Sequence, residues 1–352
     1  MQTHTSTRRE LVWFPNSCLG TCSLLKFLLA AILLSGTTII TKAHSNEIEY
    51  PLSFKMQGNP LVRHISSTDP DVHVWEGVVW MYCSQDHPRQ PGDLSPWALM
   101  DGYHVFSSKD LVNWTDHGEI IHSRDLAWGR EGWMFAPGAA RKDGKYYLYY
   151  PHMDKMFIWR IGVAIGDSPA GPFKDIGHPI KDITGIDPKI FIDDDGQAYI
   201  YNNTAQVARL KPNMVELAER PRPIDYAPPS VKKDKTQRFL EASYMHKYNG
   251  KYYYSYTNYK NNEHQGFYAI GDSPYGPFEW KGAFAPCPEG AQFHHSLVEF
   301  KGQWYCFYHI NTSEELRNKL GLDWNGFRRI ACFDRLYYDD DGTIKVLSYT
   351  KE

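Results

Sequence analysis

An aromatic, strand-like pattern that recurs five times constrains the fold more than any other feature of this sequence. The five copies are 79–82 (VWMY), 146–149 (YYLY), 198–201 (AYIY), 252–256 (YYYSY) and 304–307 (WYCF). Measured from one aromatic residue to its counterpart, the steps are 67, 52, 54 and 52 residues. A period near 50 with few helices is typical of a β-propeller, in which each repeat is a blade of about four strands. The sequence therefore predicts an all-β, five-bladed β-propeller that forms a single domain.

A second repeat agrees with this blade count. The segment 166–173 (GDSPAGPF) recurs 105 residues later at 271–278 (GDSPYGPF), a separation of two blades. Both segments have the Gly and Pro residues of turns between strands. The longer first step contains 86–100, with three prolines and Trp97, and predicts an extended loop over one face, where functional residues often lie. Helical patterns are scarce, and the best one is 313–319.

The composition argues against several kinds of partner. Aromatic residues make up 15% of the chain, with 24 Tyr and 11 Trp, which suits stacking on sugar rings. The formal net charge is −3 and no basic stripe is present, so we expect no nucleic acid or anionic membrane as partner. A neutral polysaccharide or oligosaccharide fits better. Of the six cysteines, Cys83 and Cys306 fall in strand-like runs and are expected to be buried.

The first 45 residues are predicted to be a signal peptide or presequence. Two arginines at 8–9 precede an apolar run at 27–34, and 41–43 (TKA) is a candidate cleavage site, an order typical of secretory signals. A membrane span needs about 20 apolar residues, and Lys26 and Gly36 interrupt this run before that length. We therefore expect a secreted or periplasmic protein whose mature chain has no membrane anchor and whose propeller covers 46–352.

Acidic residues recur at one phase of the repeat. If each aromatic run is the second strand of its blade, the residue 11 or 12 places earlier lies on the innermost strand, beside the central channel. That offset falls on Asp69, Phe135 or Ala136, Asp187, Glu241 and His294. Like charges gathered at one axis raise one another's pKa, so such a cluster is a candidate functional site. For any one acid taken singly, a solvated strand end or a turn is the alternative.

Glycoside hydrolysis uses carboxyl groups in this way. One carboxylic acid protonates the leaving oxygen, and one carboxylate activates water or attacks carbon. A third carboxylate can keep the pKa of the acid high and orient it. The three acids of the repeat can supply all three roles.

Three acidic motifs resemble those of glycoside hydrolase family 43. They are 68–72 (TDPDV), 185–196 (GIDPKIFIDDDG) and 239–247 (FLEASYMHK), in the order and spacing of that family. The run 293–296 (FHHS) is similar to the fifth-blade motif of the family, and 328–329 (RR) precede a last strand of the expected kind. The resemblance covers about residues 59–347.

The resemblance implies a role for each acid. The family consists of inverting five-bladed propellers, in which Asp69 would be the general base, Glu241 the general acid and Asp187 the modulator of the pKa of that acid. Inversion leaves room for a water, so the Asp69 and Glu241 carboxyls should lie about 6.5–9.5 Å apart. Asp71 is the rival base, because it shares a strand face with Asp69. The family pattern puts the base immediately before proline, which favours Asp69.

The resemblance also implies contacts with substrate and metal. Arg329 matches an arginine that contacts substrate hydroxyls, with pairing to a surface acid as the alternative. His294 resembles an axial histidine that faces a central calcium in many members, often through water. It is therefore a candidate for substrate binding and for a structural Ca²⁺ at the propeller axis, although no cofactor is expected to be required.

Aromatic residues are candidates for the walls that stack on sugars. They are Trp75, Trp133 and Phe135, with core packing as the alternative for each. The run 135–138 (FAPG) departs from the family, in which many members have an acid after the proline, and this departure bears on the shape of the pocket.

The activity that these motifs predict is exo-acting α-L-arabinofuranosidase or β-xylosidase, acting on hemicellulose such as xylan or on pectin side chains. Endo-arabinanase and exo-β-galactosidase action on the same fold are alternatives. A non-catalytic carbohydrate-binding propeller would bind sugar even with Asp69→Asn and Glu241→Gln. A retaining propeller such as a fructan hydrolase would hold its two carboxyls about 5–5.5 Å apart.

Overall fold

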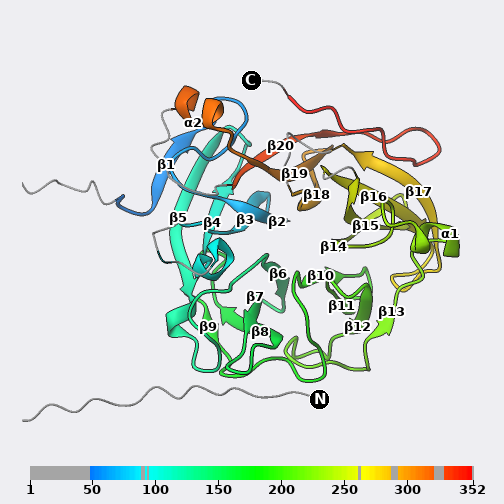
Figure 1. The fold of residues 1–352 in the computed structure, drawn as a ribbon, viewed down its shortest axis with the longest axis horizontal. Coiled ribbons are helices and arrows are strands. Elements are labelled where there is room, and N and C mark those ends of the chain that lie inside the picture. Colours follow the sequence, from blue (N-terminus) through cyan, green and yellow to red (C-terminus); the bar gives the residue numbers. More distant parts are fainter. Residues whose placement is uncertain are drawn as a thin grey trace, which may run out of the picture. The chain divides into compact units, whose positions relative to one another are not determined.

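Five antiparallel sheets make up this computed structural model and are arranged around one axis (Figure 1). The structure describes residues 48–350 except 89–91, 93–94, 261–262, 287–291 and 321–328. The predicted presequence 1–45 lies outside the described residues, as do the first two and the last two residues of the predicted domain 46–352. Each sheet is a blade, and the prediction of an all-β, five-bladed propeller is confirmed.

The blades follow one another along the chain. Blade 1 contains β1 (Leu52–Lys55), β2 (Thr68–Trp75), β3 (Val78–Ser84), β4 (Gly102–Ser108) and β5 (Asn113–His122). Blade 2 contains β6 (Gly138–Lys142), β7 (Lys145–Met153), β8 (Trp159–Gly166) and β9 (Lys174–Asp175), and blade 3 contains β10 (Lys189–Ile192), β11 (Ala198–Tyr201), β12 (Gln206–Arg209) and β13 (Arg222–Pro223). Blade 4 contains β14 (Glu241–Tyr248), β15 (Lys251–Lys260), β16 (Glu263–Gly271) and β17 (Phe278–Ala285), and blade 5 contains β18 (His295–Phe300), β19 (Gln303–Asn311) and β20 (Arg329–Leu336).

Short helices lie between strands. They are α1 (Pro229–Lys233), α2 (Glu314–Leu320) and two 3₁₀ turns at Pro96–Leu99 and Ser123–Asp125. The helix predicted at 313–319 corresponds to α2. The repeated Gly- and Pro-rich segments join the third strand to the fourth in blades 2 and 4, so their separation of two blades is confirmed.

Each predicted aromatic run is the second strand of its blade, and both of its faces are buried. In β7, Tyr146, Leu148 and Tyr150 pack with residues of blade 1. Tyr147 and Tyr149 of the same strand pack with residues of blade 3. This division follows from the alternation of side chains along a strand. Across the described residues the alternation produces five apolar clusters, one between each neighbouring pair of blades.

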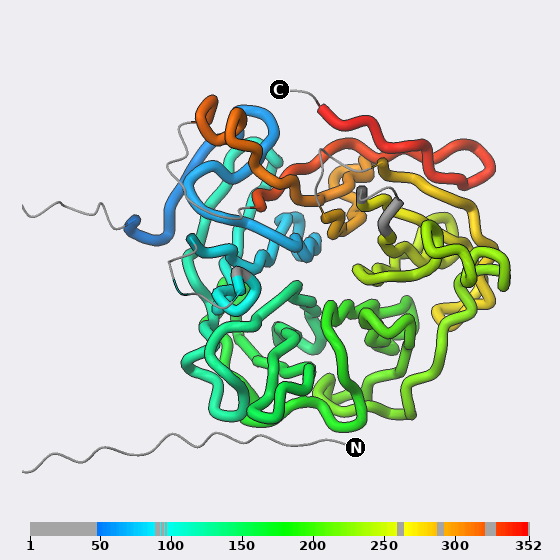
Figure 2. Tube along the Cα trace, in the orientation of Figure 1, coloured from blue at the N-terminus to red at the C-terminus, as the bar shows by residue number. Residues whose placement is uncertain are grey.

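The first and last blades meet through the segment that precedes β2. The N–H of Leu61 donates to the carbonyl oxygen of Ala331 (2.8 Å). The side chain of Asn59 exchanges two hydrogen bonds with the backbone of Phe333, 274 positions away in the sequence. Segment 59–67 thus follows the edge of β20 that β19 leaves open, and this seam closes the ring (Figure 2).

The described cysteines are buried in the propeller. Cys83, Cys306 and Cys332 are buried, which confirms the expected burial of the first two, whereas Cys287 is outside the described residues. No helix in the described part of the chain is long and apolar enough to cross a membrane.

Candidate active site

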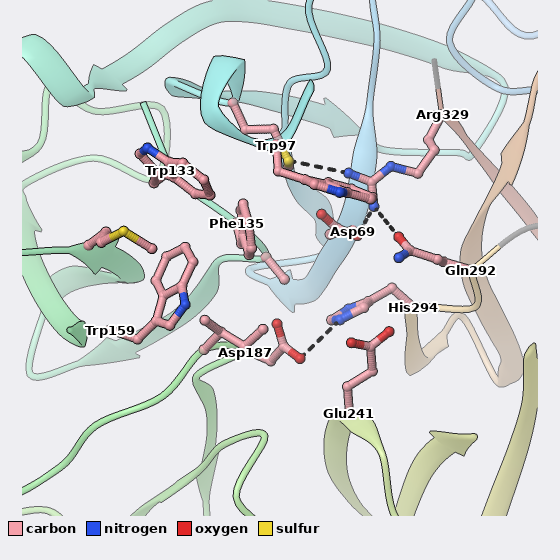
Figure 3. A pocket seen from close by; sticks show the side chains of 14 residues that line it. Asp69, Trp97, Trp133, Phe135, Trp159, Asp187, Glu241, Gln292, His294 and Arg329 are labelled. Atoms are coloured by element: carbon pink, nitrogen blue, oxygen red, sulfur yellow. Dashed lines mark hydrogen bonds and ion pairs between the residues drawn. The ribbon is translucent and has the colours of Figure 1, made fainter. Parts of the chain in front are cut away.

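The residues at the predicted repeat phase lie at or within three residues of the starts of the inner strands of the five blades, and they meet at one pocket (Figure 3). The pocket has a volume of about 320 Å³. From the predicted phase it contains Asp69, Phe135, Ala136, Asp187, Glu241 and His294. Its other walls include Trp97, Met100, Trp133, Met153, Trp159, Ile186, Gln292 and Arg329. The repeat spacing therefore identified the side chains that converge there, including all three acids.

Unusual backbone conformations place the acidic side chains. Asp69 and Asp187 have φ angles of 50° and 56°, and Ala242, which follows Glu241, has a φ of 58°. Non-glycine residues seldom adopt this left-handed conformation, and Asp adopts it more readily than most. The strand pairing also shifts register near Asp69 in β2 and near Glu241 in β14. Bulges of this kind commonly re-aim side chains beside active sites.

Asp69 is buried and ionised. Its Oδ1 accepts a hydrogen bond from Arg329 Nη1 (3.0 Å), and its Oδ2 accepts bonds from Ser84 Oγ (2.6 Å) and Thr68 Oγ1 (2.8 Å). Its N–H donates to His309 Nδ1 (3.0 Å). Burial opposes ionisation, but the positive charge of Arg329 and the other polar neighbours outweigh it and hold the pKa of Asp69 well below its usual value. A carboxylate in this state can accept a proton.

Glu241 has the opposite shift. Burial is the main cause, the negative charges of Asp187 and Asp69 add to it, and together they raise the pKa of Glu241 to about 7. Its carboxyl accepts no hydrogen bond from the described part of the chain. His264 Nδ1 is 3.8 Å from Glu241 Oε1, but that nitrogen accepts the N–H of Phe293, and burial lowers the pKa of His264 to about 3. Glu241 can therefore hold a proton and donate it.

Asp187 contacts both the axial histidine and the backbone next to Glu241. Its Oδ2 accepts the N–H of Ala242 (3.2 Å), and because Ala242 follows Glu241, this bond ties Asp187 to the backbone that presents Glu241. His294 Nε2 is 3.4 Å from the same oxygen. Burial lowers the pKa of His294, but the charge of Asp187 outweighs that effect and the net shift is upward. His294 Nδ1 is buried and has no hydrogen-bond partner among the described residues.

Asp86 fixes Arg329, which sequence reasoning did not anticipate. The Nε and Nη2 atoms of Arg329 bind the two carboxylate oxygens of Asp86 at 3.1 and 2.9 Å. The remaining Nη1 points to Asp69 and to Gln292 Oε1 (2.9 Å). Arg329 is 2% exposed, so the alternative that it pairs with a surface acid is wrong. Its contact with substrate hydroxyls stays a prediction.

Four aromatic residues form the walls of the pocket. Phe135 lies 4.6 Å from Trp159 and 6.1 Å from Trp97 between ring centroids, and Trp133 lies 6.1 Å from Trp159. Trp133 and Phe135 are thus where the sequence placed them. Trp97 comes from the long loop expected over one face. Trp159 begins β8 and is outside the aromatic runs of the repeat, so no pattern in the sequence pointed to it.

Trp75 is outside the pocket, and its assignment to substrate binding is wrong. It ends β2, stacks on His73 at 4.9 Å and lies 5.3 Å from Tyr146 between ring centroids. A strand rises about 3.3 Å per residue, so the six steps from Asp69 to Trp75 span about 20 Å. The two residues therefore belong to opposite ends of the inner strand, and Trp75 serves the packing between blades 1 and 2.

Asp71, the rival base, is also outside the pocket. Its Oδ1 accepts a bond from Lys189 Nζ (2.7 Å), and its Oδ2 accepts the N–H of Ala139 (2.6 Å) and lies 2.9 Å from His73 Nε2. All of these groups are protein atoms of blades 1, 2 and 3. Asp71 thus joins the inner strands of three blades.

Gly138, where the sequence departs from the family, lies in close contact with the neighbouring blade. A Cβ at this position would come 2.1 Å from the carbonyl oxygen of Pro188. That distance is far inside van der Waals contact, so glycine is what allows β6 to approach the neighbouring blade. Gly138 thus serves the packing of blades, and the bearing of this departure on the shape of the pocket stays a prediction.

A five-bladed propeller whose aromatic pocket holds one carboxyl with a lowered pKa and one with a raised pKa has the fold and site of a propeller glycosidase. Comparison with known proteins gives the family: the model of "Glycosyl hydrolases family 43" matches residues 57–344, and the chain belongs to this family.

The chain is similar to relatives along most of its length. It is 38% identical to a "Xylosidase/arabinosidase" of Bacteroides ovatus, over 78% of this chain and 93% of that protein. It is 38% identical to a "Xylosidase/arabinosidase 43A" of Humicola insolens, over 81% of this chain and 98% of that protein. A solved β-xylosidase/α-arabinofuranosidase from a compost metagenome, in complex with xylotriose and calcium-free, superposes with a TM-score of 0.76 at 36% identity, covering 86% of this chain and 100% of that one.

Proposed function

We propose that this protein is an exo-acting glycosidase that releases terminal α-L-arabinofuranosyl or β-D-xylosyl units from hemicellulose or pectin side chains, with inversion at the anomeric carbon. The observation that carries the proposal is the pair of carboxyls in one pocket, Asp69 with a lowered pKa and Glu241 with a raised pKa. The relatives named xylosidase/arabinosidase support a pentose as the sugar released.

In the proposed mechanism Glu241 is the general acid. It donates its proton to the glycosidic oxygen as the bond from that oxygen to the anomeric carbon breaks. Asp69 accepts a proton from the water whose oxygen forms the new bond on the opposite face of the sugar. Each transfer contributes about 10²–10⁴ to the rate. The charge of Asp187 helps Glu241 to remain protonated near neutral pH.

The first test uses the 4-nitrophenyl α-L-arabinofuranoside and β-D-xyloside. Wild type should release 4-nitrophenol from at least one, and the ratio of the two rates ranks the two specificities. Asp69→Asn should abolish release, whereas Glu241→Gln should lose less on these activated substrates than on a disaccharide, because nitrophenol leaves with little help from an acid. Proton NMR of the first product should show the inverted anomer.

Other outcomes identify the alternatives. Retention of configuration would exclude the assignment of Asp69 as base. Hydrolysis of linear arabinan without release of single pentoses would indicate an endo-arabinanase. Binding of oligosaccharides without any hydrolysis would indicate the carbohydrate-binding propeller.

We also propose that residues 1–45 direct export of the protein, on the basis of the arginines, apolar run and cleavage candidate described above. Mass spectrometry of the secreted protein should find a mature N-terminus near residue 46. Detection of the uncleaved chain in a membrane fraction would contradict cleavage and would indicate that residues 1–45 act as a membrane anchor.

Calcium at the axis is a further part of the proposal. The described residues contain no group of three His, Cys, Asp or Glu that could hold a metal ion by themselves. The buried Nδ1 of His294, which has no hydrogen-bond partner among the described residues, is available to a water in the coordination shell of an axial cation, which would add positive charge beside Asp187. Calorimetric titration with Ca²⁺ should therefore show binding that His294→Ala weakens.

A further inference from the structure

Apolar side chains stand in solvent at the tip of the hairpin between β7 and β8. Met156 is 78% exposed, Phe157 65% and Ile158 38%. Scattered exposed apolar residues are ordinary on a protein surface, but three in succession on a projecting turn are not. Three exposed apolar side chains in succession suggest that the turn binds a ligand or a partner.

Several hydrogen bonds hold this turn in one conformation. Asp154 Oδ1 accepts the N–H groups of Met156 (2.8 Å) and Ile158 (2.9 Å), and its Oδ2 accepts a bond from Arg160 Nε (3.1 Å). The N–H of Asp154 donates to the carbonyl of Ile158 (2.9 Å). Phe157 has a φ of 63°, a left-handed conformation that costs energy for an aromatic residue. The turn is thus built to present Met156 and Phe157 outward.

The hairpin tip is continuous with the wall of the pocket. Met153 and Trp159 pair with each other at the base of the turn, and both line the pocket. Residues 154–158 therefore extend directly from that wall. The N–H of Arg130 donates to the carbonyl oxygen of Met153 (2.9 Å), which brings Arg130 to the same place.

Arg130 adds polar donors beside the exposed ring. Its guanidinium lies 3.9 Å from the centroid of Phe157. It forms no ion pair with any residue that the structure describes, and its buried Nε has no hydrogen-bond partner there. An arginine that stacks on an aromatic ring and keeps unused N–H donors is suited to hydroxyl groups packed against that ring.

We propose that Arg130, Met156 and Phe157, which we call the leaving-group rim, bind the sugar residues that remain after the terminal pentose is cleaved. The C–H faces of these sugars pack on Phe157 and Met156, and Arg130 donates to their hydroxyls. We choose a saccharide as the ligand because the rim is continuous with Met153 and Trp159, which line the pocket. This inference rests on the proposed function, since it concerns the part of the substrate that extends from the same pocket.

The test compares substrates that share a terminal pentose and differ in the length of the leaving group. For wild type, Arg130→Gln and the double variant Met156→Ser/Phe157→Ser, kcat/KM is measured on the β-1,4-linked xylose disaccharide and tetrasaccharide, or on the α-1,5-linked arabinose pair if arabinose is the sugar released. Val346→Ser is the matched control, because Val346 is 66% exposed and lies outside the pocket and the rim.

We expect the ratio of kcat/KM for the tetrasaccharide over the disaccharide to fall about tenfold in the double variant and about threefold in Arg130→Gln, with no change in Val346→Ser. The melting temperature of each variant checks that the fold is kept. An unchanged ratio in folded variants would overturn the rim while leaving the proposed function intact. The rim would also be overturned if wild type were a dimer that the double variant dissociates while the ratio stays the same. Absence of all pentoside hydrolysis by wild type would instead refute the proposed function and the rim with it.

Discussion

Replacing Glu241 by Gln removes the proposed general acid. The variant should nevertheless become more stable than wild type as the pH rises. Glutamine keeps the shape of the side chain but cannot ionise. In wild type, burial and the neighbouring acids raise the pKa of Glu241 from 4.5 to about 7. Above pH 7 the folded wild-type protein therefore contains a buried carboxylate that the variant lacks.

The magnitude follows from linkage between protonation and folding. Between pH 4.5 and 7 the folded state binds a proton at Glu241 that the unfolded state has released, so stability falls as the pH rises. The stabilising effect of this proton is fully present below about pH 4.5 and lost above about pH 7. One pKa unit corresponds to about 1.36 kcal/mol, so the whole shift amounts to about 3 kcal/mol. With an unfolding entropy of about 2.1 cal/mol/K per residue over about 300 residues, this equals about 5 °C in melting temperature.

The assay is calorimetric melting of wild type and Glu241→Gln at pH 5 and pH 8. Because part of the effect is already lost at pH 5, the melting temperature of the variant minus that of wild type should increase by about 4 °C between the two conditions. Glu299→Gln is the matched control, because Glu299 is exposed and the same subtraction should show no such increase. A difference for Glu241→Gln that is the same at both pH values would refute the reasoning, whatever its size.

The remaining predictions concern the rate profile and two structural residues. The kcat/KM for an unactivated disaccharide should fall as the pH rises through about 7, where Glu241 loses its proton, and an optimum at pH 9 would contradict its role as acid. Asp71→Asn should lower the free energy of unfolding by about 3–5 kcal/mol in denaturant titrations, because it leaves the buried Lys189 without its carboxylate, yet the folded fraction should remain active. Gly138→Ala should lower the melting temperature markedly, because its Cβ would clash with the carbonyl oxygen of Pro188, and a melting temperature equal to that of wild type would show that the blades separate at little cost.

The sequence predicted the features that depend on the repeat. The aromatic runs identified the second strand of every blade because both faces of that strand are buried, which leaves a strong pattern. The fixed offset from those runs then identified Asp69, Asp187 and Glu241, since equivalent positions in a propeller converge on one axis. The resemblance to a family added an assignment of roles to these positions.

What the sequence missed lies outside that repeat. Trp159 and Asp86 come from the edges of blades and from a long loop, where position in space depends on how neighbouring blades pack. Trp75 was misplaced because an aromatic residue near Asp69 in sequence lies at the far end of the same strand. Spacing along the chain indicates which end of a blade a residue occupies only if the direction of the strand is considered.

The seam between the first and last blades determines when the protein can become active during its synthesis. Asp69 belongs to blade 1, and Arg329, which holds it ionised, begins the last strand of blade 5. Closing a chain segment of this length has an entropic cost, and contacts so distant in sequence form late. A nascent chain that has not yet delivered β20 has neither Arg329 nor the backbone partners of segment 59–67. Its Asp69 lacks the charge that keeps it ionised, so the proposed general base is in place only once the ring is complete.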